Sequence, residues 1–149
     1  MAHMDSQINA LLIEDNPDDA MLMEAALEDA RGISIRVEWV DRLEAGIEML
    51  SNGNQWDVVL LDLSLPDAHG LDTFTRLYSA HSDVAVVVLT GLDDEELSSA
   101  ALREGAQDYI VKGQTDEDML LRSIRYAVQR KRGEEAIRRS ETRYRTLFE

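Results

Sequence analysis

Polar residues of chemically useful types stand directly after four short apolar runs of the sequence. Glu14 and Asp15 follow the first of these runs, and Asp62, Thr90 and Lys112 each follow a later one. Carboxylates that lie close together repel one another and need a compensating cation. A small number of protein oxygen ligands suits Mg²⁺, which keeps several of its waters. With that ion in place, one carboxylate can attack a phosphoryl group while the ammonium and hydroxyl groups neutralise charge on its oxygens. These residues therefore predict Mg²⁺-dependent phosphoryl transfer if the fold brings them together.

Each residue taken alone also has a purely structural interpretation. Asp62 can begin a turn, and Thr90 can cap the helix that follows it. Lys112 fits such an interpretation less well, because it directly follows an apolar run and is the only lysine before Lys131. A residue of the required type after four separate runs favours a functional site over a set of unrelated turns and caps.

The site requires strands that end side by side, and the hydrophobic pattern supplies them. Five apolar runs alternate with helical patterns, and the runs cover residues 10–13, 33–40, 58–61, 84–89 and 109–111. The third and fourth runs are apolar without alternation, as are strands that are buried on both faces of a parallel sheet. The order predicts an α/β fold, doubly wound as (βα)5 around a central five-stranded parallel sheet. Such folds place their ligand site at the carboxyl ends of the strands.

Capping residues mark where several of the helices begin. Asn16 followed by Pro17 predicts the start of the first helix, Asp41 that of the second and Asp116 that of the last. Two further helices are expected at residues 71–78 and 95–104. These elements leave short loops after the strands, where the candidate residues lie.

Composition excludes several classes of protein. The 149 residues include 30 acidic and 15 basic ones, and the net charge of −15 argues against nucleic acid as the main partner. No apolar stretch approaches the roughly 20 residues that span a bilayer. The absence of cysteine excludes disulfides and thiolate metal ligands. We therefore expect a cytoplasmic protein without direct nucleic-acid or membrane binding.

Charge also divides the chain. Up to Leu121 there are 26 acidic and 6 basic residues, whereas 4 acidic and 9 basic residues follow it. This distribution predicts an acidic body that ends in an exposed basic helix. We expect the body at residues 7–129 and a linker helix at residues 130–149. Residues 1–6, which begin with MAHM, are expected to be a tag remnant and a disordered N-terminus.

Four linked motifs give the sequence a recognisable family pattern. They are LLIEDNPDD at the first strand, VVLLDLSLPDAHG at the third, VVVLTG at the fourth and GAQDYIVKG at the fifth. In these motifs, over residues 9–129, the sequence resembles the receiver domain of two-component response regulators. The resemblance implies a flavodoxin-like receiver fold and a phosphorylation-dependent signalling switch. It implies self-catalysed phosphotransfer and dephosphorylation at an aspartate, not a conventional enzyme.

The resemblance also implies a role for each candidate residue. Asp62 would be the phosphoacceptor, and Thr90 and Lys112 would contact the phosphoryl group. The implied Mg²⁺ ligands are Glu14, Asp15, Asp62 and the backbone carbonyl of Ser64. The phosphoryl group would come from a histidine kinase or a phosphotransfer protein.

Two further features of the family concern switching and the lifetime of the phosphoryl group. Tyr109 matches the aromatic switch residue that turns inward when the Thr90 hydroxyl moves toward the phosphoryl group. Ser64 and Leu92 occupy positions that tune hydrolysis in the family. The switch is therefore expected at Thr90 and Tyr109.

The sequence departs from the family at three positions and excludes two rival functions. Gly113 replaces a common proline, Ala68 a common methionine, and Glu14 a more frequent aspartate. The glycine leaves open a degenerate receiver that binds proteins independently of phosphorylation. Aspartate-nucleophile phosphatases place a second aspartate where this chain has Ser64, and a flavin phosphate would be repelled by Glu14 and Asp15.

The end of the sequence carries a second resemblance. RRSETRYRTLFE looks like the linker and first residues of a PAS sensory domain. This resemblance implies a downstream PAS or other output domain as a partner, and the linker helix allows a homodimer. The heptad pattern that would support such pairing is broken at Lys131 and Glu135. A solvated helix extension is an equal alternative to the signalling helix.

Overall fold

The computed structural model describes residues 7–53, 55–91 and 94–148. Its main sheet contains β1 (Gln7–Ile13), β2 (Ser34–Val40), β3 (Val58–Asp62), β6 (Ala85–Thr90) and β7 (Asp108–Val111). All neighbouring strands are parallel, in the order β2-β1-β3-β6-β7. The predicted doubly wound fold is therefore confirmed. Residues 1–6 and Leu92, about which the sequence made predictions, lie outside the described residues.

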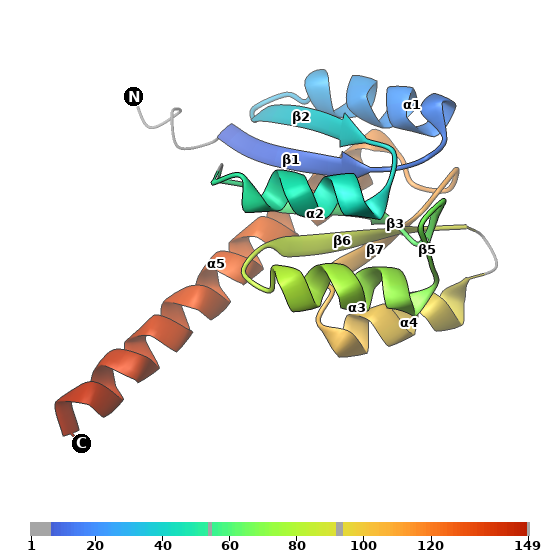
Figure 1. Cartoon of the computed structure of the whole chain (residues 1–149). Helices are drawn as coiled ribbons and strands as arrows, with labels where there is room; N and C mark the ends of the chain where they lie inside the picture. Colours follow the sequence, from blue (N-terminus) through green and yellow to red (C-terminus); the bar gives the residue numbers. More distant parts are fainter. Residues whose placement is uncertain (1–6, 54, 92–93, 149) are drawn as a thin grey trace.

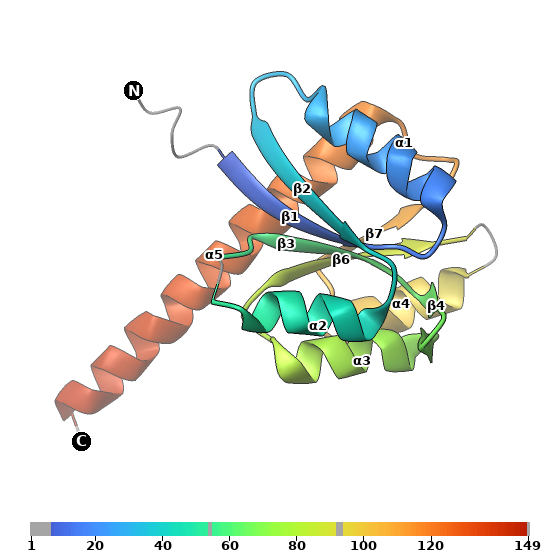
Figure 2. The same ribbon diagram turned by 45° about the horizontal axis from the view of Figure 1, so that its top comes forward.

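In the part of the chain that the structure describes, five helices cover the two faces of the sheet (Figures 1 and 2). They are α1 (Pro17–Glu28), α2 (Leu43–Ser51), α3 (Leu71–Ala80), α4 (Glu95–Glu104) and α5 (Glu117–Phe148). Side chains of α1 and α5 pack on one face, whereas those of α2, α3 and α4 pack on the other. The three-layer arrangement leaves the loops at the carboxyl ends of the strands as a shared edge.

The central strands are buried on both faces. Every residue of β3 and β6 is buried. In β3, Val58 and Leu60 join the core beneath α1 and α5, and Val59 and Leu61 join the core on the opposite face. This division explains why these runs lack an alternation of apolar and polar residues.

A two-stranded antiparallel sheet that the sequence did not predict follows β3. It consists of β4 (Ser64–Leu65) and β5 (Ala68–His69), which are joined through Pro66 and Asp67. The N–H of Gly70 donates to the carbonyl of Leu63 at 2.7 Å and closes the loop behind the hairpin. The segment after Asp62 is thus an ordered hairpin, which fixes the backbone beside that carboxylate.

The second helix begins differently from the sequence prediction. Asp41 was expected to cap it, but Arg42 is the N-cap residue and Asp67 supplies the acceptors from the distant hairpin. The two carboxylate oxygens of Asp67 accept hydrogen bonds from the backbone N–H groups of Leu43 and Glu44, each at 2.9 Å. Burial raises the pKa of Asp67, but these backbone hydrogen bonds outweigh burial and hold the pKa below its usual value. The prediction for Asp41 was wrong because the hairpin places a better acceptor at the helix end.

The substitution Asp67→Ala is expected to lower the free energy of unfolding by about 1 kcal/mol, because two backbone donors of α2 lose their acceptors. Asp41→Ala removes a carboxylate that is 59% exposed. Such a surface change is expected to alter the same quantity by less than about 0.5 kcal/mol. Urea denaturation of both variants beside the parent protein measures the difference. Equal losses would contradict the assignment of Asp67 as the cap.

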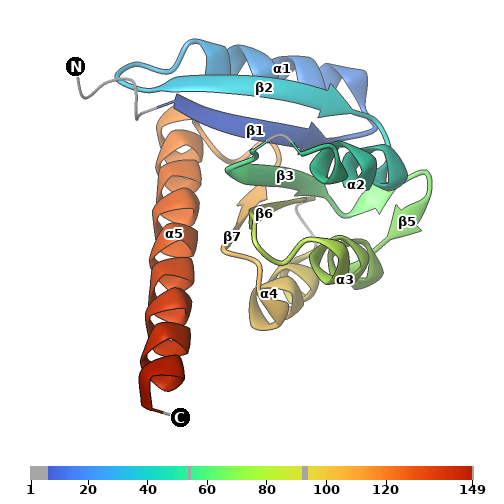
Figure 3. The same ribbon diagram turned by 60° about the vertical axis from the view of Figure 1, so that its left-hand side comes forward.

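The last helix extends beyond the part that packs on the sheet. At 32 residues, α5 continues well beyond the sheet (Figure 3). Beyond residue 129 it is still held to the body: Arg132 pairs with Asp57 at 3.0 Å, and the Gln107 side chain donates to Glu134 at 3.1 Å. Lys131 is only 4% exposed, with its ammonium 5.4 Å from the centre of the Tyr78 ring. The helix therefore crosses the predicted boundary at residue 129 without a break.

No helix in the described part of the chain is both long enough and apolar enough to cross a membrane.

Candidate functional site

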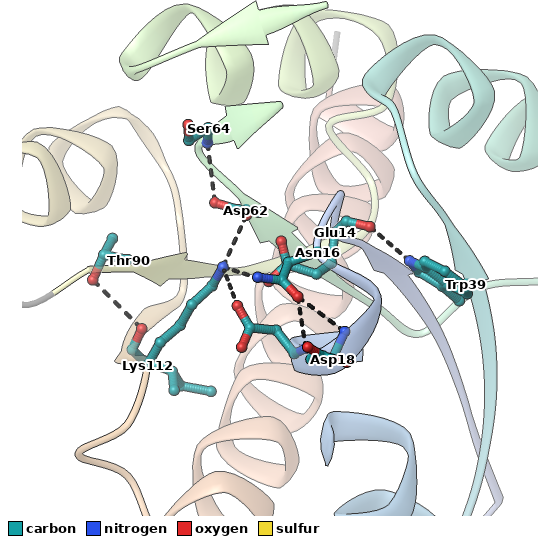
Figure 4. Close-up of polar contacts among 10 residues, drawn as sticks. Glu14, Asn16, Asp18, Trp39, Asp62, Ser64, Thr90 and Lys112 are labelled. Carbon is teal, nitrogen blue, oxygen red and sulfur yellow. Dashed lines mark hydrogen bonds and ion pairs between the residues drawn. The ribbon is translucent and has the colours of Figure 1, made fainter. Parts of the chain in front are cut away.

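Parallel strands bring the candidate residues to one edge of the sheet (Figure 4). Asp62 ends β3 and Thr90 ends β6, while Glu14 directly follows β1 and Lys112 directly follows β7. The register pairs Ile13 with Leu61, Asp62 with Leu89 and Thr90 with Val111, which places the four strand ends level with one another. Residues almost 100 positions apart in the sequence thus share one small volume.

Three carboxylates at this edge could hold a metal ion. Glu14, Asp15 and Asp62 each offer an oxygen atom, and these oxygens lie within 4.8 Å of one another. Glu14 is only 1% exposed, and its Oε2 has no hydrogen-bond partner among the described residues. A buried carboxylate oxygen without a partner is costly, and a cation would satisfy it. All three candidate ligand atoms are oxygens, and Asp15 is exposed to solvent. This set of ligands fits a Mg²⁺ ion that keeps several waters.

The ammonium of Lys112 lies among carboxylates. It forms ion pairs with Glu14, with Asp62 at 2.9 Å and with Asp19 at 3.3 Å. Burial lowers the pKa of Lys112, but hydrogen bonds with Glu14 and Asp62 outweigh burial and raise the pKa above its ordinary value. Lys112 therefore stays cationic and compensates part of the negative charge.

The charge on Glu14 is strongly coupled to this arrangement. Burial raises the pKa of the Glu14 carboxyl from 4.5 to about 8, with Asp62 adding to the rise and Lys112 opposing it. At neutral pH and without a bound cation, Glu14 therefore tends to hold a proton. A metal ion that binds here competes with that proton.

The Asp62 side chain is fixed by two donors of different kinds. Its Oδ1 accepts the backbone N–H of Ser64 at 3.0 Å, and its Oδ2 accepts from Lys112 at 2.9 Å. Ser64 thus contacts Asp62 through its N–H, and the role of its carbonyl as a metal ligand stays a prediction. Both oxygens of Asp62 are oriented by protein donors, and its side chain is 8% exposed.

Thr90 links the strand ends to α4. Its hydroxyl donates weakly to the carbonyl of Ile110 at 3.4 Å and accepts from the Ser98 hydroxyl at 3.3 Å. Ser98 lies on α4 and is 1% exposed. Tyr109 is half-buried against the core on the face of α3 and α4. Thr90 thus contacts α4 through Ser98, whereas Tyr109 lies on the face of the sheet that α3 and α4 cover, and the movement of both residues stays a prediction.

Comparison with known proteins decides the family. Residues 10–125 match the response regulator receiver domain family. The chain belongs to that family.

Relatives of the receiver domain are longer than this chain. The response regulator UvrY of Escherichia coli K12 is 29% identical over 127 residues, which cover 83% of this chain and 56% of UvrY. The cell cycle transcriptional regulator CtrA of Caulobacter vibrioides is 30% identical over 126 residues, covering 85% of this chain and 52% of CtrA. The chain therefore spans about half the length of these curated relatives.

Solved structures agree with the receiver fold. A response regulator receiver domain protein from Clostridium thermocellum superposes with a TM-score of 0.74 at 26% identity, over 84% of this chain and 97% of that one. The signal receiver domain of an HD domain-containing protein from Pseudomonas fluorescens Pf-5 gives a TM-score of 0.76 at 20% identity, over 88% of this chain and 93% of that one. The second likeness concerns the fold alone.

Gly113 shows how this receiver domain accommodates one departure from the family pattern. Its φ is +82°, in the left-handed region that favours glycine. Proline fixes φ near about −65°, so it is incompatible with this backbone. A proline at position 113 would therefore require a different backbone in the loop after Lys112.

Three residues of the receiver site were missed by sequence reasoning. Asp19 reaches Lys112, Ser98 reaches Thr90, and the Trp39 indole N–H donates to the carbonyl of Glu14 at 2.6 Å. Asp19 lies in the LLIEDNPDD motif, which predicted no role for it, and nothing in the local pattern of Ser98 or Trp39 marked them. Each contact joins elements that are far apart in the sequence, so only the fold identifies them.

Proposed function

We propose that this receiver domain accepts a phosphoryl group on Asp62 in a Mg²⁺-dependent reaction and passes the change on as a conformational switch. The observation that carries the proposal is the setting of the Asp62 carboxylate. It is buried at the end of β3, lies 2.9 Å from the Lys112 ammonium and belongs to a cluster of three carboxylates that suits a divalent cation. A nucleophile, a fixed cation and a metal-binding set are the parts that phosphoryl transfer needs.

Each residue has a defined task in this mechanism. An oxygen of Asp62 forms the bond to phosphorus, while the bond from phosphorus to the donor breaks and the donor atom leaves with the electron pair. Lys112 stabilises charge on the phosphoryl oxygens, and the Thr90 hydroxyl donates to another of them. Mg²⁺, held by Glu14, Asp15, Asp62 and the Ser64 carbonyl, supplies further charge neutralisation when bound.

The switch follows from the contacts of Thr90. When its hydroxyl moves to the phosphoryl group, the hydrogen bond from Ser98 breaks and α4 loses one of its contacts with the end of β6. Tyr109 turns inward into the space that the hydroxyl leaves. The changed face would comprise α4, β7 and α5, and phosphorylation would select a conformation that is already sampled.

The partners in this proposal follow the family. A histidine kinase or a phosphotransfer protein donates the phosphoryl group from a phosphohistidine, and Ser64 and Leu92 tune its hydrolysis. The α5 helix, which projects beyond the body, relays the change to a PAS or other output domain and can pair with a second copy. A cytoplasmic location and the absence of direct nucleic-acid binding stay predictions.

Incubation with acetyl phosphate and Mg²⁺, followed by intact mass spectrometry, tests the proposal. We expect one added phosphoryl group with Mg²⁺ and none with EDTA. Beryllofluoride with Mg²⁺ provides a second test, because it mimics the phosphoryl group without a transfer step. Failure of both reagents would favour the degenerate receiver that Gly113 leaves open.

A further inference from the structure

Asp19 is a partner of Lys112 to which neither the family pattern nor the proposed mechanism gives a role. It lies on the first turn of α1, where its backbone N–H donates to Asn16 at 3.2 Å. Its Oδ2 lies 3.3 Å from the Lys112 ammonium. The group of carboxylates that could share a metal ion consists of Glu14, Asp15 and Asp62. Asp19 therefore acts on the ammonium and not on the metal site.

The number of donors on Lys112 makes this contact consequential. An ammonium group has three N–H donors. Three carboxyl groups surround it, those of Glu14, Asp19 and Asp62, so each donor faces an acceptor before any phosphoryl group arrives. Lys112 must release one carboxylate to contact a phosphoryl oxygen.

Asp19 is the partner that Lys112 can release most easily. Its contact with the ammonium is longer than that of Asp62, and its side chain is 40% exposed, whereas those of Glu14 and Asp62 are 1% and 8% exposed. Water can solvate Asp19 after release, but it reaches the buried carboxylates poorly. Asp19 and Lys112 also line two hollows, of about 340 Å³ beside Asp62 and about 290 Å³ between α1 and Gly113. The pair therefore lines the hollow that reaches Asp62.

We propose that Asp19 is a positioning residue that holds Lys112 at the mouth of the site and slows phosphoryl transfer until Lys112 exchanges it for a phosphoryl oxygen. The kinetic part rests on the proposed function. With acetyl phosphate, an Asp62 oxygen bonds to phosphorus and acetate leaves with the electron pair of the broken P–O bond. Asp19 keeps its carboxylate throughout and changes only its hydrogen bonds.

The contact is tested by NMR on protein labelled at lysine Cε. The chain contains two lysines, Lys112 and Lys131, so Lys131 serves as an internal reference. Asp19→Asn is expected to shift the Lys112 resonance and leave that of Lys131 unchanged. Asp18→Asn is a matched control, because Asp18 lies on the same turn and also donates its N–H to Asn16. An unchanged Lys112 resonance in Asp19→Asn would overturn the positioning role, whether or not the protein accepts a phosphoryl group.

The effect on transfer is measured as the rate of adduct formation against acetyl phosphate concentration. Asp19→Asn is expected to raise the maximal rate about threefold to tenfold, because Lys112 no longer has to release a carboxylate. Asp19→Glu should restore the slow rate, and Asp18→Asn, with the same change in net charge, should leave it within about twofold. Equal rates for Asp19→Asn and Asp18→Asn would overturn the kinetic role. Absence of adduct in every variant would instead refute the proposed function, and with it the kinetic role, while the NMR result still decides the contact.

Discussion

Asp62→Asn is expected to abolish the phosphoryl adduct that acetyl phosphate and Mg²⁺ form with this receiver domain. The amide cannot act as the nucleophile, and it also removes one of the three charges that would hold the metal ion. Losses on the order of a thousandfold or more are typical when a nucleophile is replaced. Intact mass spectrometry over a time course measures the loss directly.

Asp57→Asn is a matched control at the other end of the same strand. Asp57 directly precedes β3 and accepts hydrogen bonds from the Asn9 N–H at 2.8 Å and from Arg132 at 3.0 Å. It is far from the strand ends that carry the site, so its loss should alter stability and leave adduct formation intact. An adduct of equal yield on Asp62→Asn would show that another residue accepts the phosphoryl group.

The sequence predicts this architecture well where one strong signal acts over consecutive residues. The unbroken apolar runs of β3 and β6 predict buried parallel strands, because both faces of those strands need apolar side chains. The polar residues that follow them, Asp62 and Thr90, then meet at one edge through the geometry of the sheet alone. The β4–β5 hairpin was missed because strands of two residues leave no periodicity to detect.

Contacts between distant residues set the limit of sequence reasoning. Asp67 caps a helix that begins 24 residues earlier, and Asp19 reaches a lysine 93 residues later. Lys131 is a further example of a contact that the local sequence did not reveal. From the sequence alone it was interpreted as a break in the heptad pattern of an exposed helix. In the structure it faces the body and lies against Tyr78, so its charge says little about the exposed side of α5. The local sequence pattern indicates the element to which a residue belongs, whereas its contact partner depends on how the whole chain folds.

The second large effect concerns Glu14 and the pH dependence of stability without metal. The Glu14 pKa is about 8 in the folded protein against an ordinary value of 4.5. Between these pH values the folded state keeps a proton that the unfolded state has lost, so rising pH favours unfolding. The free energy of unfolding should fall by several kcal/mol from pH 4.5 to 8 and change little from this cause above pH 8. Glu14→Gln should remove that slope and exceed the parent protein in metal-free stability above pH 8.

Mg²⁺ should reverse this penalty, because ion binding takes the place of the proton on Glu14. At pH 7 the parent protein is therefore expected to release protons as it binds Mg²⁺, and its affinity should rise with pH. Asp15→Asn is the matched comparison: Asp15 belongs to the same carboxylate group but is exposed. Asp15→Asn should lose Mg²⁺ affinity but keep the pH dependence of the free energy of unfolding without metal. Glu14→Gln should lose both the Mg²⁺ affinity and that pH dependence. Denaturation at several pH values and calorimetry in buffers of different ionisation enthalpy separate the two effects. Identical pH slopes for the parent protein and Glu14→Gln would mean that Glu14 is ionised at neutral pH and that Lys112 alone offsets its burial.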